Sequence, residues 1–381
     1  MKLFISTGDV SGDFNGSLLI QALREQNPTI EFAAVGGEKV KESGAQILAD
    51  STSWSSIGFF DSLKKAPTII MAYQRLKKQL SALKFNAAVL IDCPAFNLHL
   101  ASFLFNSGIP IYYFFPPSAW KNDLNRAKQV GRCLKAVIAP FPESAALYEK
   151  AGVPVFFSGH PLVDTIRSHE LKSNFYSACE KLKLNPDKPI IGLFPGSREQ
   201  EIRYLLPILL KAGELLLEKF EDIQFVLPIA SKNLKRQILS KIAQFRLQVT
   251  AVENSNYDIL LVSTALIISS GTATLEAALY EKPMVIVYKV SPLTWKFERH
   301  FLKGVSFAGL PNLLLGRKVV PELIQEKAKP EVIFHELVRF LTEKDYAATV
   351  KNDLRQIRPL LGSPGVMKRV ANLILEALNH A

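Results

Sequence analysis

The turn at residues 195–198, Pro-Gly-Ser-Arg, is the first place where residue types and spacing suggest chemistry. It follows an apolar run at 190–194 and precedes a helical pattern from 204 to 218. A strand that enters a helix through such a turn leaves free backbone N–H groups at the helix N-terminus. These groups and the helix dipole favour a bound phosphate, and the planar guanidinium of Arg198 matches phosphate oxygens. The turn therefore predicts a phosphate site, although an ordinary turn with a surface arginine fits the same residues equally well.

A second turn of this kind lies at residues 268–276. Ser270, Gly271 and Thr272 place small side chains and bare N–H groups where a helix is expected to begin. Glu276 follows one turn later, where a carboxylate can accept hydrogen bonds from both hydroxyls of a ribose. A capped helix with an acidic first turn is the plainer interpretation. Two phosphate-suited turns in one domain favour a nucleotide ligand.

Asp92 is placed where a general base would be needed. It directly follows the apolar run 87–91, which predicts a buried strand, and it precedes Pro94. At the carboxyl end of a parallel strand, a carboxylate points into the crevice where α/β proteins bind ligands, and there it can take a proton from a substrate. The alternative role is a helix cap for residues 95–104.

The segments that must position these residues alternate between apolar strands and helical patterns. Residues 3–6 predict a strand, and the turn at 7–13 leads to a helix that Ser11 or Asp13 can cap. Further strands are predicted at 32–35, 87–91, 110–114 and 136–139, then at 190–194, 224–227, 266–269 and 283–287. Residues 311–325 predict a loop that enters a helix, and the closing helical patterns lie at 330–341, 347–361 and 366–378. The alternation predicts parallel sheets covered on both faces.

This pattern predicts an α/β fold with two doubly wound, Rossmann-like domains facing a central cleft that holds the ligand. A chain of 381 residues is too long for one ordinary core, which also favours two domains. The linker is expected at 159–164 and in the polar stretch 167–174. The predicted boundaries are 1–165 for an N-terminal domain, 166–355 for a nucleotide-binding domain, and 356–381 for C-terminal helices that pack back on the N-terminal domain.

Composition limits the class of protein and its compartment. A hydrophobic content of 48% with 21% charged residues describes a well-packed globular chain. Three cysteines, Cys93, Cys133 and Cys179, have no metal-ligand spacing and predict a reducing compartment. The N-terminus does not resemble a signal peptide, and no apolar run reaches the ~18–20 residues of a membrane-spanning helix. We therefore expect a cytoplasmic protein.

The net charge of +11 suggests an anionic partner, which could be nucleic acid, a membrane surface or a phosphorylated substrate. The segment 54–83 favours a membrane, because aromatic rings beside cations suit a lipid interface. A core helix with a solvated basic face is the plainer interpretation. No motif supports nucleic-acid binding or a metal site. The residues that carry the membrane hypothesis are Ile57, Phe59, Phe60, Lys64 and Lys65.

Seven short motifs, taken in order, give the chain a family resemblance. They are Gly-Asp-Val-Ser-Gly-Asp (8–13), Ile-Asp-Cys-Pro-Ala-Phe-Asn (91–97), Pro-Ser-Ala-Trp (117–120), Gly-His-Pro (159–161), Pro-Gly-Ser-Arg (195–198), Ser-Gly-Thr-Ala-Thr-Leu-Glu (270–276) and Leu-Pro-Asn-Leu-Leu (310–314). Together they resemble the lipid-A-disaccharide synthases, inverting glycosyltransferases of Gram-negative outer-membrane biosynthesis. The match runs from Leu3 to about Gln325 and more loosely to the end.

The resemblance implies a GT-B fold and a reaction that needs no metal or other cofactor. Family members transfer 2,3-diacylglucosamine from UDP-2,3-diacylglucosamine to the 6-hydroxyl of 2,3-diacylglucosamine 1-phosphate (lipid X), giving a β-1,6-linked disaccharide and UDP. Carried over by position, Asp92 is the base that takes the proton from this hydroxyl, and Arg198 holds the UDP diphosphate. The residues expected to bind the UDP-sugar are Ser11, Gly196, Ser197, Arg198, Ser270, Gly271, Thr272, Glu276, Asn312 and Gln325.

The resemblance also implies partners and a location. Family members associate with the inner membrane from the cytoplasm, and known members form C-terminally swapped homodimers. No nucleic-acid partner is expected. The residues expected to meet the membrane or the acceptor are Ile57, Phe59, Phe60, Lys64, Lys65 and Trp120.

The sequence departs from the family pattern at four positions, although Asp92 is retained. Asp9 stands where a glutamate is usual, Ala95 where a second aspartate is usual, Asn122 where a tryptophan is common, and Lys289 where an arginine is usual. Two alternatives therefore stay open. One is another GT-B activity, such as a UDP-N-acetylglucosamine transferase or 2-epimerase, and the other is a peripheral membrane protein that binds a nucleotide without catalysis.

Overall fold

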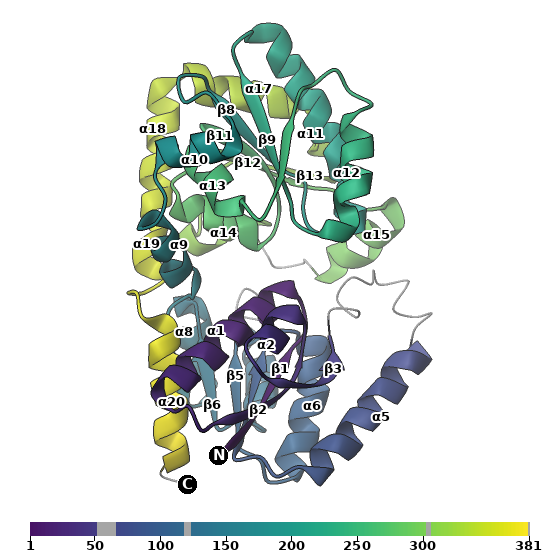
Figure 1. Ribbon diagram of the computed structural model, residues 1–381, viewed down its shortest axis with the longest axis vertical. Coiled ribbons are helices and arrows are strands. Elements are labelled where there is room, and N and C mark those ends of the chain that lie inside the picture. The colour runs from purple at the N-terminus through teal and green to yellow at the C-terminus, as the bar shows by residue number, and fades with distance from the viewer. Residues whose placement is uncertain (52–65, 118–122, 302–305, 380–381) are drawn as a thin grey trace. The chain divides into compact units, whose positions relative to one another are not determined.

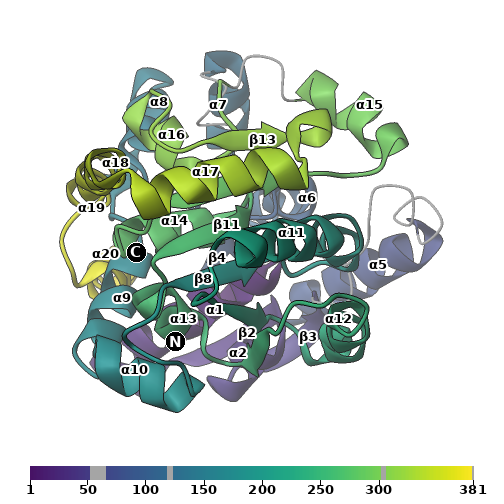
Figure 2. The same ribbon diagram turned by 90° about the horizontal axis from the view of Figure 1, so that it is seen from above.

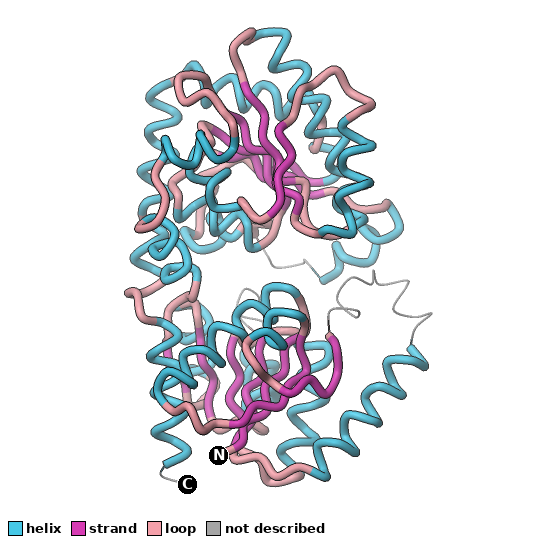
Figure 3. Tube along the Cα trace, viewed as in Figure 1, coloured by secondary structure: helices cyan, strands magenta, loops and turns pink. Residues whose placement is uncertain are grey.

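The computed structural model describes residues 1–51, 66–117, 123–301 and 306–379, whose elements are labelled in Figure 1. The chain divides into two compact units. The first consists of Met1–Asp164 with Leu360–Ala381, and the second consists of Thr165–Pro359. In each unit the strands form a central sheet that is enclosed by helices (Figure 3). The predicted α/β class, with two parallel-sheet domains, is therefore confirmed.

The first unit is built on a parallel sheet with the strand order β3-β2-β1-β4-β5-β6-β7. Every residue of the central strand β4 is buried, which explains why this strand is a continuous apolar run in the sequence. The strands are β1 (Lys2–Thr7), β2 (Glu31–Gly36), β3 (Gln46–Asp50), β4 (Ala87–Ile91), β5 (Ile111–Phe114), β6 (Ala136–Ala139) and β7 (Val155–Phe157).

Helices cover both faces of this sheet. Leu3 and Ile5 pack in a cluster with α1 (Val10–Gln26) and α20 (Val366–Asn379), whereas Phe4 packs on the opposite side with α5 (Ala66–Ala82) and α6 (Pro94–Asn106). Each large apolar side chain that is buried in this way contributes about 1.5–3 kcal/mol. The remaining helices are α2 (Glu38–Glu42), α7 (Leu124–Gly131) and α8 (Pro142–Lys150). Among the described residues of the whole chain, no helix combines the length and apolarity that a membrane crossing would require.

The second unit contains a parallel sheet with the order β10-β9-β8-β11-β12-β13. The strands are β8 (Ile190–Phe194), β9 (Gln224–Ile229), β10 (Thr250–Glu253), β11 (Ala265–Ser269), β12 (Met284–Tyr288) and β13 (Glu322–Ile324). On one face, α11 (Glu199–Lys219) and α17 (Pro330–Thr342) lie side by side (Figure 2). On the other face, α10 (Phe175–Leu182) packs against α13 (Asn256–Val262), which lies beside α14 (Thr272–Leu279).

Both passages of the chain between the units occur inside helices, α9 (Leu162–Glu170) and α19 (Ile357–Leu360). The boundary between the units at 164/165 falls between the two stretches predicted as the linker, 159–164 and 167–174, and residues 167–170 of the second stretch are helical. Within the first unit, Asp164 accepts hydrogen bonds from the N–H groups of Gly365 and Val366 at the start of α20. The remaining helices of the second unit are α12 (Lys235–Ile242), α15 (Pro292–Phe301), α16 (Leu310–Leu315) and α18 (Lys344–Arg355), with short 3₁₀ turns at Lys232–Leu234 and Gln325–Lys327.

The structure corrects the prediction for residues 311–325. The residues of the expected loop lie in the helix α16, whose second residue is Pro311, in the first turn, where proline is tolerated. The expected helix start is the strand β13. The sequence also did not predict the strands β3, β7 and β10. All three have partly exposed residues, so none of them forms the continuous apolar run that marks a central strand.

Candidate functional site

Asp92 lies at the carboxyl end of β4, between β1 and β5. Its main chain and that of Cys93 adopt left-handed conformations, with φ values of 52° and 47°, which non-glycine residues rarely adopt. Buried side chains hold this bend in place. The Asp92 carbonyl accepts hydrogen bonds from Tyr113 Oη at 2.7 Å and from Asn97 Nδ2 at 2.8 Å, and the fold therefore dictates where the Asp92 side chain points.

The Asp92 carboxylate is not the cap of the following helix. Among the described residues, the donor to Oδ1 is the next N–H group, that of Cys93, at 2.8 Å. Cys93 is the N-cap residue of α6 and makes no side-chain cap bond. Burial, followed by the nearby charge of Asp9, raises the pKa of Asp92 to about 6, although the Cys93 N–H bond lowers it. A carboxyl group with this pKa is largely ionised at neutral pH and still has appreciable proton affinity, as a general base requires.

Asp9 lies near Asp92 at the same edge of the sheet. β1 and β4 are neighbouring parallel strands whose last residues, Thr7 and Ile91, lie opposite each other, and Asp9 and Asp92 follow these residues. A Cβ atom on Gly8 would lie 2.0 Å from the Cys93 Cβ, so only glycine allows this close approach. Asp9 Oδ1 accepts a hydrogen bond from Gly12 N at 2.7 Å, and Asp9 is the N-cap of α1.

The prediction that Ser11 or Asp13 caps α1 is therefore wrong. The Asp13 carboxylate accepts hydrogen bonds from N–H groups at the start of α2, including Lys39 N at 3.0 Å. Ser11 lies in the first turn of α1 and is partly exposed.

The turn at 195–198 differs from its prediction, because its backbone donors are not all free. Glu201 Oε2 accepts hydrogen bonds from Ser197 N at 2.8 Å and Arg198 N at 3.1 Å. A Cβ atom on Gly196, whose φ is 106°, would lie 2.1 Å from the same oxygen. Glu201 stands three residues into the helix, where a glutamate commonly satisfies the N-cap N–H. The Arg198 side chain is 64% exposed, with Nη1 3.7 Å from Glu201 Oε1, so a ligand can reach its guanidinium.

The turn at 270–272 fits its prediction more closely. Gly271 and Thr272 are exposed at the start of α14, and no hydrogen bond from another described residue occupies their backbone N–H groups. Ser270 Oγ donates to the Ala308 carbonyl at 2.7 Å, which fixes the turn against the segment before α16. The free N–H groups of a helix that is held in this way form a suitable anion site.

Sheet register brings the two turns together. β8 and β11 are neighbouring parallel strands, and Phe194 lies opposite Ile268. Neighbouring strands lie about 4.8 Å apart, so the turns that follow them lie side by side at one edge of the sheet. The structure thus places Arg198 near the open N–H groups of Gly271 and Thr272.

Glu276 lies one turn into α14, with a partly buried side chain. Tyr257 Oη donates a hydrogen bond to Glu276 Oε1 at 3.3 Å. Burial raises the pKa of Glu276 to about 7, and the Tyr257 bond acts in the opposite direction. A ligand that donates hydrogen bonds to this carboxylate would favour its ionised form.

Asn312 and Gln325 are buried in the second unit, where their amide groups form hydrogen bonds with neighbouring loops. Asn312 is fully buried, and its amide group donates to Val320 O and Glu322 Oε1 and accepts from the N–H groups of Val319 and Val320. Gln325 is 5% exposed, and its amide pairs with both main-chain polar atoms of Val290 at 3.3 Å. Both side chains therefore hold loops near the sheet edge.

The residues predicted to meet the membrane or the acceptor lie outside the described residues: Ile57, Phe59, Phe60, Lys64, Lys65 and Trp120. The described part of the same segment is α5. Its apolar side chains Leu76 and Leu80 are buried in the core, whereas Arg75 and Lys78 are exposed. For this helix, the interpretation as a core helix with a solvated basic face is correct.

The sequence alone did not identify several residues that shape the site. Glu201 had a usable signal, because a glutamate three residues after a helix start is typical of a capping box. Tyr257 had none, since 19 positions separate it from Glu276 and only the packing of α13 against α14 joins them. Within residues 1–51, 66–117, 123–301 and 306–379, no three His, Cys, Asp or Glu side chains form a group that could hold a metal ion.

Comparison with known sequences supports a single family. A family model described as lipid-A-disaccharide synthetase matches residues 3–373. A lipid-A-disaccharide synthase from Geobacter sulfurreducens is 36% identical over 377 residues, covering 99% of this chain and 97% of the relative. A protein of the same name from Coxiella burnetii is 34% identical over 374 residues, covering 98% of this chain and 97% of the relative.

Comparison with solved structures gives the fold. A UDP-GlcNAc 2-epimerase from Neisseria meningitidis bound to UDP-GlcNAc superposes with a TM-score of 0.68 at 13% identity, covering all of both chains. MnaA of S. aureus with UDP gives a TM-score of 0.66 at 16% identity, covering 100% of this chain and 98% of the other. MurG of Acinetobacter baumannii gives a TM-score of 0.57 at 16% identity, covering 98% and 99%. These similarities identify the GT-B fold.

Proposed function

Because the chain belongs to the lipid-A-disaccharide synthase family, a family of glycosyltransferases, we propose the following reaction for it. The protein transfers 2,3-diacylglucosamine from UDP-2,3-diacylglucosamine to the 6-hydroxyl of 2,3-diacylglucosamine 1-phosphate, and it releases UDP. The observation that carries the proposal is Asp92, a carboxyl group with a pKa of about 6 held at a strand end by Tyr113 and Asn97.

The reaction needs a base for the acceptor. In the proposed step, a carboxylate oxygen of Asp92 takes the proton of the acceptor 6-hydroxyl. The 6-oxygen of the acceptor attacks the donor carbon C1 from the face opposite UDP as this proton leaves. The bond from C1 to the β-phosphate oxygen breaks, and its electron pair leaves with UDP. The new bond is therefore β, and one proton passes from the acceptor to Asp92.

The reaction also needs cationic and N–H groups for the departing diphosphate. We assign these roles to the Arg198 guanidinium and to the backbone N–H groups of Gly271 and Thr272, which are exposed and open. Such preorganised donors stabilise charge as it develops on a leaving group. Glu276 accepts the ribose hydroxyls, and Ser270 and Asn312 keep the surrounding loops in place.

The lipid nature of both substrates suggests where the protein acts. A net charge of +11 suits the anionic acceptor and the anionic face of the inner membrane, so we propose peripheral attachment from the cytoplasm through residues 57–65. We also propose a homodimer that exchanges C-terminal helices. In a single chain, α20 packs against α1, and an exchanged α20 would make the same contacts with its partner.

An assay of donor choice tests the proposal. Purified protein is given the acceptor lipid with either UDP-2,3-diacylglucosamine or UDP-N-acetylglucosamine, and both release of UDP and conversion of the UDP-sugar into its C2 epimer are measured. We expect turnover only with the acylated donor. Turnover of only the unacylated donor would favour another UDP-N-acetylglucosamine transferase or a 2-epimerase, and UDP binding without turnover of either donor would favour a non-catalytic nucleotide-binding protein.

A further inference from the structure

Glu276 has three rotatable side-chain bonds, so its carboxylate needs support to present a fixed face to a ligand. Among the described residues, the donor that reaches this carboxylate is Tyr257 Oη, 3.3 Å from Oε1. Burial raises the pKa of Tyr257 well above its ordinary value, so its hydroxyl remains protonated and stays a donor. The second oxygen, Oε2, has no protein donor within this described set.

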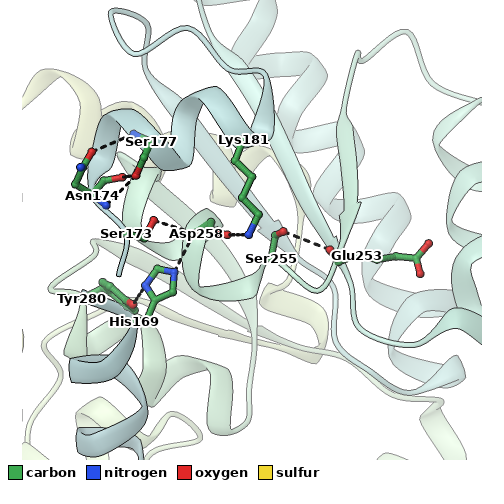
Figure 4. A network of polar contacts seen from close by, with 9 residues as sticks. All are labelled: His169, Ser173, Asn174, Ser177, Lys181, Glu253, Ser255, Asp258 and Tyr280. Atoms are coloured by element: carbon green, nitrogen blue, oxygen red, sulfur yellow. Dashed lines mark hydrogen bonds and ion pairs between the residues drawn. The ribbon is translucent and has the colours of Figure 1, made fainter. Parts of the chain in front are cut away.

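The Tyr257 ring is itself held in place. Tyr257 is the second residue of α13, shortly after the end of β10, and its ring centroid lies 5.7 Å from that of the His169 imidazole. His169 is fixed at both ring nitrogens. Nε2 lies 2.9 Å from Asp258 Oδ1, and Nδ1 lies 2.7 Å from Tyr280 Oη (Figure 4).

Asp258 anchors this network. Its side chain is 5% exposed, and its carboxylate also accepts hydrogen bonds from Lys181 Nζ at 2.6 Å and Ser173 Oγ at 3.2 Å (Figure 4). Burial alone would raise the pKa of Asp258, but the bonds from Lys181 and His169 outweigh burial and lower it, so the carboxylate stays charged. A hollow of about 360 Å³ lies beside the network, with Tyr257 in its wall.

The network therefore makes two hydrogen bonds to one face of α14, at Glu276 and at Tyr280. Glu276 and Tyr280 are four residues apart, so they lie on the same side of the helix. Tyr257 holds the first, and His169, bound to Asp258, holds the second. Tyr257 and Asp258 are adjacent in the chain, so a single helix start fixes both positions.

We infer that Tyr257 is a positioning residue that orients the Glu276 carboxylate toward both ribose hydroxyls, and that it thereby makes the site selective for ribonucleotides over 2′-deoxyribonucleotides. The inference rests on the proposed role of Glu276 in the donor site. The ribose has two neighbouring hydroxyl groups. A carboxylate that accepts one hydrogen bond from each of them must keep both of its oxygens pointing toward these hydroxyls. Without the Tyr257 bond, Glu276 can rotate away and favours its neutral form, which accepts such bonds less well.

The test compares the binding of UDP and 2′-deoxy-UDP by calorimetry. In Tyr257→Phe, UDP should bind about tenfold more weakly, which corresponds to the loss of one hydrogen bond to a charged group. Binding of 2′-deoxy-UDP should change less than about twofold, because that ligand cannot use the second hydroxyl bond. Tyr176→Phe is the matched control, since Tyr176 is 72% exposed on the neighbouring helix α10, and it should leave both affinities unchanged.

A double-mutant cycle separates positioning from general loss of structure. Glu276→Gln should also weaken UDP binding selectively, and adding Tyr257→Phe to it should weaken UDP binding no further. Equal loss of UDP and 2′-deoxy-UDP in Tyr257→Phe, or no loss of either, would overturn the inference. Absence of UDP binding by the unaltered protein would overturn the proposed function as well, so the two failures are distinguishable.

Discussion

Replacement of Asp92 by asparagine is expected to lower turnover by ~10²–10⁴-fold and, at the same time, to stabilise the protein. Asparagine keeps the shape of the side chain and can still accept the hydrogen bond from Cys93 N, but it cannot take a proton. Loss of a general base typically lowers kcat by ~10²–10⁴, which corresponds to about 3–5 kcal/mol of transition-state stabilisation. UDP should bind as before, because Arg198, Gly271 and Thr272 belong to the other unit.

The pKa of Asp92 determines the pH dependence. The base must be ionised, so kcat/KM should fall tenfold per pH unit below about pH 6 and level off above it. The residual activity of Asp92→Asn should lack this acid limb. A mutant profile that keeps the limb unchanged would assign the proton transfer to another group.

The expected gain in stability follows from the same pKa. A carboxyl whose pKa is higher in the folded than in the unfolded protein binds protons more tightly when folded, so the folded state loses stability as pH rises from its ordinary pKa through the raised value. The difference between 3.8 and about 6 corresponds to at most about 3 kcal/mol at neutral pH. Asp92→Asn removes this cost, so its Tm at pH 7 should rise.

The assay measures UDP release, UDP affinity and Tm for the same protein samples. Asp222→Asn is the matched control, because Asp222 is 78% exposed in a surface ion pair with Lys188 and should change none of the three. If Asp92→Asn kept more than about a tenth of the wild-type kcat, a general-base role would be refuted. If its Tm fell, the assigned burial cost of the carboxylate would be refuted.

Three further changes test other parts of the site. Arg198→Lys keeps the charge but loses the planar fork, so kcat/KM for the donor should fall roughly tenfold or more in steady-state assays, and unchanged kinetics would exclude a diphosphate contact. Glu201→Gln removes a carboxylate that competes for Arg198 at 3.7 Å, so UDP should bind about two- to fivefold more tightly in calorimetry, and weaker binding would contradict this. Phe59→Ser combined with Phe60→Ser should reduce co-sedimentation with anionic vesicles, and unchanged binding would remove the proposed membrane contact.

The sequence predicted the central strands well because burial on both faces leaves an unbroken apolar run, as in β4 and β8. Edge strands lack this signal. β13 has only three residues and begins with Glu322, whose carboxylate accepts hydrogen bonds from the N–H groups of Ala308 and Gly309, so its residue types alone do not predict a strand.

The sequence predicted those site residues that lie in the turn directly after a predicted strand. Glycine turns after apolar runs led to Arg198 and Gly271, and the strand end led to Asp92. The contacts that modify these residues depend on tertiary packing. Glu201 occupies donors that the sequence left free for phosphate, and Tyr257 reaches Glu276 only because α13 and α14 pack together.

Identification of the product tests the central claim most directly. The purified protein is incubated with UDP-2,3-diacylglucosamine and 2,3-diacylglucosamine 1-phosphate, and the lipid product is analysed by mass spectrometry and by NMR of its glycosidic linkage. We predict a β-1,6-linked tetraacyl-disaccharide 1-phosphate, formed in equal amount with UDP and formed ~10²–10⁴-fold more slowly by Asp92→Asn. Release of UDP without a disaccharide, or formation of a disaccharide at the wild-type rate by Asp92→Asn, would contradict this account.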